Sequence, residues 1–165
     1  MFNGIHHHIL KHLGPLHPFP LPKARPVILL GERPNSRRLE KSKELQRDIQ
    51  SRYPNSTLLI FNGERVSLND LFEFFGHADI FVSPHGAGFS NMLFMKNTST
   101  LIEIIPEDYQ ENCFEVIAKL FGLKRHAIVG KGQLNSELQL NPQKLQMLLD
   151  ISFQAIQDFQ QSQSS

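Results

Sequence analysis

The chain has 165 residues, of which 40% are hydrophobic and 20% are charged, and its formal net charge is +1. This composition predicts one globular domain of ordinary size, and the near-neutral charge gives no electrostatic case for a nucleic-acid partner. The single cysteine excludes an internal disulfide framework and gives no zinc-ligand pattern, and no apolar run of about 18 residues predicts a membrane span.

The first 25 residues differ from the rest. Ile5 to Leu13 predicts a short helix that ends at Gly14, and the alternating prolines of residues 15–22 predict a stiff, extended linker. The histidines of this helix have no carboxylate or cysteine nearby, so we expect no metal site. We therefore divide the chain into an N-terminal helix and Pro-rich linker (1–25), one domain (26–160) and a disordered tail (161–165).

Within the domain, short apolar runs alternate with amphipathic segments. We expect strands at 27–30, 57–61, 80–82, 101–105 and 126–129, and helices at 36–53, 67–75, 88–95, 110–121 and 142–159. In the second of these helices we expect Ser67 and Asp70 to form a capping box, with Leu68 facing inward. Such alternation predicts an α/β domain with a mostly parallel five-stranded sheet that is covered on both faces.

Residues 79–95 are the most informative stretch. The third strand runs into a tight turn, His85-Gly86-Ala87-Gly88, and then into a helix. A helix N-terminus carries unpaired N–H donors and partial positive charge, so it suits a phosphate. Gly86 and Gly88 would let the backbone approach the anion closely, and His85 would add a side-chain donor at the lip of the site.

The loop after the first strand should lie at the same edge of the sheet, because ligands of such sheets bind beyond the carboxyl ends of the strands. This loop contains Arg33, Arg37 and Arg38, whose guanidinium groups can bind phosphate oxygens in pairs. The sequence therefore predicts an anion site at this edge of the sheet.

Two further polar residues have open roles. Asn91 either bonds the ligand or caps the backbone inside the turn. Glu103 lies in an apolar strand, where an unpaired carboxylate is costly. It either pairs with one of the arginines or reaches a ribose hydroxyl.

These residues resemble glycosyltransferase family 61. The resemblance extends from about Ile28 to Val129. Its most specific parts are the first strand with its arginine loop (28–39), the segment Ala78 to Val82, and the motif Pro84 to Phe94. Lys41 departs from the family, which usually has asparagine there, and this leaves the contacts of the first helix in doubt.

The resemblance implies a Rossmann-like three-layer sandwich, similar to the C-terminal, donor-binding domain of a GT-B glycosyltransferase. It implies that the domain binds a nucleotide-sugar through Arg33, Arg37, Arg38, residues 85–88, Asn91 and Glu103, for transfer to a glycan or glycoprotein hydroxyl without a metal or cofactor. Without an N-terminal acceptor domain this chain alone would be inactive, and no residue is assigned as catalytic. In a eukaryote the resemblance implies the secretory pathway or the Golgi.

Two alternatives have different functions. One is a non-catalytic nucleotide-binding remnant. The other is a dinucleotide-binding oxidoreductase module, which we disfavour because the third glycine of its fingerprint is absent and Gly86-x-Gly88 follows the third strand instead of the first. The base, the sugar and the acceptor have no signal in the sequence.

Overall fold

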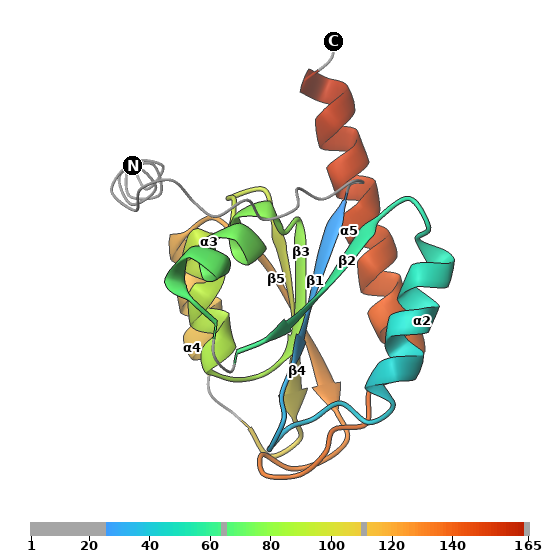
Figure 1. The fold of residues 1–165 in the computed structure, drawn as a ribbon, viewed down its shortest axis with the longest axis vertical. Coiled ribbons are helices and arrows are strands. Elements are labelled where there is room, and N and C mark those ends of the chain that lie inside the picture. The colour runs from blue at the N-terminus through green and yellow to red at the C-terminus, as the bar shows by residue number, and fades with distance from the viewer. Residues whose placement is uncertain (1–25, 64–65, 110–111, 164–165) are drawn as a thin grey trace.

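The computed structural model describes residues 26–63, 66–109 and 112–163, so the predicted N-terminal helix and linker lie outside the described residues. Five strands form one sheet in the order β2-β1-β3-β4-β5 (Figure 1). Their bounds are β1 Val27–Glu32, β2 Thr57–Asn62, β3 Ile80–Pro84, β4 Thr100–Pro106 and β5 Lys124–Gly130. Every neighbouring pair is parallel, which confirms the predicted α/β class.

Helices cover both faces of the sheet, so the fold is a three-layer Rossmann-like sandwich (Figure 1). The helical elements are α2 Ser42–Arg52, α3 Leu68–His77, the 3₁₀ helix η1 Ala87–Phe94, α4 Cys113–Leu120 and α5 Pro142–Gln163. Alternate residues of the strands point to opposite layers. Ile28 and Leu30 pack with side chains of α2 and α5, whereas Leu29 and Phe81 pack with side chains of α3, η1 and α4.

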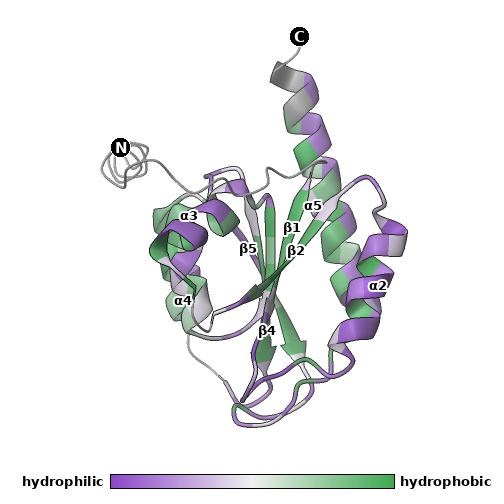
Figure 2. Cartoon of the chain, in the orientation of Figure 1, coloured by the Kyte–Doolittle hydropathy of each residue, from purple (hydrophilic) through white to green (hydrophobic). Residues whose placement is uncertain are grey.

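Both layers are apolar toward the sheet, and the polar helix faces point outward (Figure 2). Phe75, Phe81 and Phe89 are fully buried in this core, and the ring of Phe81 lies at a centroid distance of 4.9 Å from each of the other two rings. In the described part of the chain, no helix combines the length and apolar character that crossing a membrane requires.

The order of the strands places a switch point between β1 and β3. From β1 the chain crosses to β2 on one side and later to β3 on the other, and β1 pairs with both. The two connections leave the sheet edge in opposite directions, and this opens a crevice at the carboxyl ends of β1 and β3. Gly31 is needed there because a Cβ at this position would overlap the side chain of Ser83 on β3.

Several element boundaries differ from the prediction. The first helix begins at Ser42 instead of residue 36, because Lys41 has a left-handed backbone (φ 56°) and Leu39 forms a bridge to Leu138. The segment after Gly86 is a 3₁₀ helix. Leu68 is 52% exposed, so its predicted inward position is wrong. The last helix continues to Gln163, into the predicted tail.

The predicted capping box of α3 is confirmed and can be tested. Ser67 Oγ accepts a hydrogen bond from Asp70 N at 3.1 Å, and the Asp70 carboxylate accepts one from Ser67 N. We expect Ser67→Ala to lower the free energy of unfolding by about 1 kcal/mol, because the N–H group of Asp70 in the first turn loses its side-chain acceptor. Urea denaturation measures this loss. The control Ser51→Ala, in the exposed last turn of α2, should change stability by less than about 0.5 kcal/mol. Equal effects of the two substitutions would contradict the cap.

Candidate functional site

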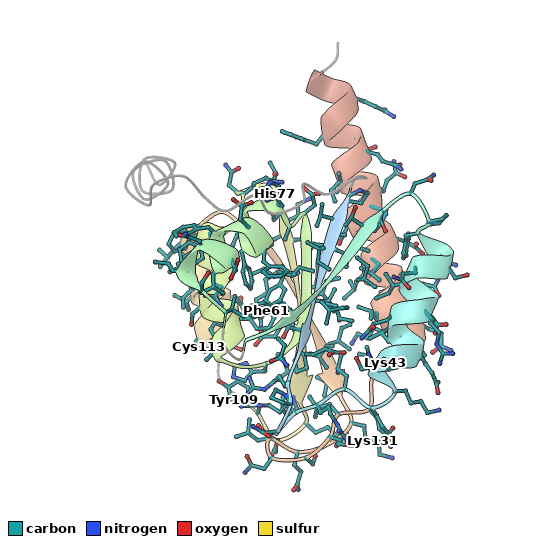
Figure 3. All side chains as sticks on the ribbon, viewed as in Figure 1. Lys43, Phe61, His77, Tyr109, Cys113 and Lys131 are labelled. Carbon is teal, nitrogen blue, oxygen red and sulfur yellow. The ribbon has the colours of Figure 1, made fainter. Side chains whose placement is uncertain are left out.

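A cleft of about 380 Å³ lies at the switch point. Its volume falls within the range of small-molecule sites. The segment after β1 forms one wall, and the turn after β3 with the start of η1 forms another. Phe61, at the end of β2, adds an apolar ring, and Figure 3 shows it in the half of the sheet that contains the carboxyl ends of the strands. The residues that line this cleft include Arg33, Phe61, Val66, Ala87, Gly88 and Asn91.

Arg33 links the two predicted loops. Its Nε donates to the carbonyl of Ser36 at 3.1 Å, and its Nη1 lies 3.5 Å from the carbonyl of His85. The guanidinium group lies against Gly86, because a Cβ built there would overlap Nη1. Gly86 has φ 155° and ψ −179°, a region that residues with a side chain rarely adopt. The turn is therefore shaped around the arginine.

Arg37 lies close enough to Arg33 for its positive charge to lower the pKa of the Arg33 guanidinium group. Burial, and secondarily the positive charge of Arg37, lower the pKa of the Arg33 guanidinium, although an arginine remains protonated at neutral pH. The Nε of Arg37 is buried and has no hydrogen-bond partner in the part of the chain that the structure describes. Among the residues that the structure describes, no carboxylate lies within 4.0 Å of either guanidinium group. Buried polar groups nearly always have a partner, so this pair of cations is suited to an anion.

Arg38 does not join this pair. It forms an exposed ion pair with Glu137, in the loop between β5 and α5. Arg37 and Arg38 both precede α2, which begins at Ser42 and not at residue 36 as predicted. The three arginines thus share one loop, but only Arg33 and Arg37 lie together.

His85 and Glu103 lie beneath the site instead of at its lip. His85 is 6% exposed and Glu103 is 1% exposed. The Nδ1 atom of His85 lies 2.5 Å from Oε1 of Glu103, and Oε2 of Glu103 accepts from Nε of Arg125 at 2.6 Å. Both carboxylate oxygens are therefore occupied. Glu103 pairs with an arginine, as one prediction proposed, but its partner comes from β5 and not from the arginine loop.

Tyr109 completes the environment of His85. The ring centroids of Tyr109 and His85 lie 3.8 Å apart, and the ring centroid of Phe114 lies 5.1 Å from that of His85. Figure 3 shows Tyr109 at the same end of the sheet as Phe61. Sequence analysis missed both Tyr109 and Arg125. Arg125 follows Lys124 at the start of a strand, where a charged pair is also common on the surface, so its burial had no local signal.

The start of η1 presents backbone donors to the cleft. The first internal hydrogen bond runs from Phe89 N to Gly86 O, so the N–H groups of Ala87 and Gly88 have no acceptor within the helix. Asn91 lines the cleft and donates from Nδ2 to Gly88 O at 3.2 Å, so it caps the backbone as one alternative predicted.

This arrangement suits the binding of an anion. Arg33, Ala87 and Gly88 line the cleft together with the apolar side chains of Phe61 and Val66, and the positive charge of Arg37 acts on Arg33. In the described ranges, no cluster of three histidine, cysteine, aspartate or glutamate residues is suited to hold a metal ion.

Comparison with known proteins identifies a family, and the solved structures described below resemble the chain only distantly. The profile of the family described as Glycosyltransferase 61 matches residues 4–102, which includes the arginine loop and the turn after β3. A "Beta-1,2-xylosyltransferase" from Arabidopsis thaliana is 33% identical over 63 residues. These cover 38% of this chain and 12% of that protein.

Two solved structures resemble the chain at 12% identity. One is a putative D-3-phosphoglycerate dehydrogenase from Ralstonia solanacearum, with a TM-score of 0.43 over 84% of this chain and 49% of that one. The other is a putative D-isomer specific 2-hydroxyacid dehydrogenase from Polaromonas sp. JS6 66, with a TM-score of 0.42 over 98% of this chain and 60% of that one. Both are too distant to inform function.

Proposed function

Because the chain belongs to the glycosyltransferase 61 family, we propose that it binds a nucleotide-sugar donor at the switch-point cleft, as part of an enzyme that transfers the sugar to a glycan or glycoprotein hydroxyl. The observation that carries this proposal is the pair of guanidinium groups of Arg33 and Arg37, which have no carboxylate within 4.0 Å among the residues that the structure describes. A nucleoside diphosphate supplies the missing negative charge.

The chemistry fits the residues present. When the bond between the sugar and the diphosphate breaks, negative charge develops on the leaving phosphate. Donors already aimed at that charge stabilise the transition state, and a single donor of this kind typically contributes about 3–4 kcal/mol. Arg33, Arg37 and the N–H groups of Ala87 and Gly88 are such donors, and this role requires no metal or cofactor. His85 and Glu103 would support the turn from below.

The proposal also includes the domain that binds the acceptor and supplies the catalytic base. Since the matched stretch spans 12% of the plant xylosyltransferase, we propose that an additional acceptor domain completes the active site in the whole protein, and that residues 26–160 form the donor domain. A eukaryotic protein of this kind would act in the secretory pathway. A binding module without catalysis would share the same cleft.

Titration calorimetry with a panel of nucleoside diphosphates and NAD tests the proposal. We expect a nucleoside diphosphate to bind, and Arg33→Ala to weaken that binding about tenfold or more, because a charge-assisted hydrogen bond is worth about 1.5–3 kcal/mol. Arg52→Ala is the matched control, since Arg52 is also an arginine on the surface but pairs with Asp150. It should bind as the unaltered chain does. Binding of NAD with no binding of any nucleoside diphosphate would overturn the proposal.

A further inference from the structure

A second cleft of about 490 Å³ lies beside the first. The segment Gly31 to Pro34 lines both clefts and separates them. The second cleft extends toward the first turn of α2, where Figure 3 shows Lys43 at the end of the helix that follows the loop after β1. Most of the residues that line it are charged or polar, whereas the first cleft contains the apolar side chains of Phe61, Val66 and Leu71.

Glu32 is the acidic residue at the boundary of the two clefts. Its Oε1 accepts hydrogen bonds from Ser42 Oγ and from Gln46 Nε2, each at 2.6 Å. Both donors come from α2 and are uncharged. They fix the carboxylate in place and leave Oε2 with no hydrogen bond among the described residues.

The surroundings make this free oxygen unusual. Arg38, Lys41 and Lys43 line the same cleft, yet within the described ranges no cation lies within 4.0 Å of Glu32. An ionised carboxylate oxygen only accepts hydrogen bonds, so it suits a ligand group that donates one, such as a hydroxyl. Sugars present several hydroxyls, and a fixed acceptor can select among them.

The base with its ribose, the diphosphate and the sugar of a nucleotide-sugar follow one another in the same order as the first cleft, Arg33 and the second cleft. The base and ribose suit the cleft that contains Phe61, the diphosphate suits Arg33, and the sugar lies on the far side of the diphosphate. Since Arg33 lines both clefts, a diphosphate bound there directs the sugar into the second cleft. We infer that Glu32 binds a hydroxyl of the donor sugar through Oε2 and so helps to determine which sugar is accepted. This inference rests on the proposed function.

Calorimetry with two ligands that differ only in the sugar tests the inference. UDP-xylose and UDP are one such pair, and the same comparison applies to whichever nucleoside diphosphate binds best. We expect Glu32→Gln to weaken binding of the nucleotide-sugar about tenfold, because the charged acceptor is lost, and to leave binding of the nucleoside diphosphate within about twofold. Glu32→Ala should show the same selective loss, and the melting temperature of each variant is measured alongside.

Glu40→Gln is the matched control, since Glu40 is an exposed glutamate that lines the same cleft. It should change neither affinity. Equal losses for the two ligands, or no loss for the nucleotide-sugar, would overturn the role of Glu32 while the donor cleft stands. If the unaltered chain binds no nucleoside diphosphate, the proposed function fails, and the role of Glu32 fails with it.

Discussion

Glu103→Ala should lower the free energy of unfolding by about 3–5 kcal/mol, which is the usual cost of removing one partner of a buried ion pair. The Arg125 side chain is 9% exposed and donates to Oε2 of Glu103 through Nε and Nη2. Without the carboxylate, this guanidinium keeps its charge in a poorly hydrated position. His85 loses the partner of its Nδ1 atom at the same time.

A neighbouring carboxylate offers little compensation. Glu115 lies 3.7 Å from Nη1 of Arg125, but it is engaged by Lys119, which is the main cause that lowers the pKa of Glu115. It is also much more exposed than Glu103. Water therefore screens this second contact more strongly than the first.

Urea denaturation of three variants tests this expectation. The control Lys119→Ala removes an exposed ion pair within one helix and should cost no more than about 0.5 kcal/mol. The double variant Glu103→Leu with Arg125→Met replaces both charges by apolar groups of similar volume, and it should recover most of the loss. A loss below about 1 kcal/mol for Glu103→Ala would show that the pair is not a structural support of the turn.

The sequence predicted the sheet well because its signal is local. Runs such as residues 27–30 and 101–105 are apolar over the length of a strand, and the five strands lie where these runs do. The capping box of α3 was also predictable, since Ser67 and Asp70 are three residues apart. Each of these features depends on a few neighbouring residues.

The features that the sequence did not predict depend on contacts between distant segments. The first helix starts late because Leu39 pairs with Leu138, about 100 residues further along the chain. Arg125 meets Glu103 because β4 and β5 pair in a register that places Arg125 opposite Leu101. No pattern within one segment determines such a register.

The turn at residues 85–88 has a local signal in the sequence, but the roles of its two glycines depend on contacts with distant segments. Two glycines next to a strand end predicted an anion site, and both were expected to let a phosphate approach. The structure distinguishes them: Gly86 has φ 155° and lies against Arg33, whereas Gly88 does not have a positive φ. A Cβ at Gly88 would meet only the ring of Phe61, at 3.7 Å, which is an ordinary contact.

Gly86→Ala should therefore abolish most nucleotide binding, whereas Gly88→Ala should not. An alanine at position 86 would overlap the Arg33 guanidinium and would occupy a backbone region that costs about 1–3 kcal/mol for a residue with a side chain. We expect a loss of unfolding free energy in that range, and at least a tenfold weaker affinity for the nucleoside diphosphate, because Arg33 must move away from the turn. Gly88→Ala is the matched control for the same cleft, and it should stay within about twofold in affinity.

Measuring both stability and affinity distinguishes backbone strain at position 86 from displacement of Arg33. If backbone strain alone acts, Gly86→Ala loses stability while its folded fraction binds as before. If the position of Arg33 matters, adding Arg33→Ala to Gly86→Ala causes little further loss of affinity, since contacts that share one group are not additive. Full additivity of the two losses would mean that Arg33 binds the phosphate from a place that Gly86 does not determine, and the turn would then not be what holds the arginine in the site.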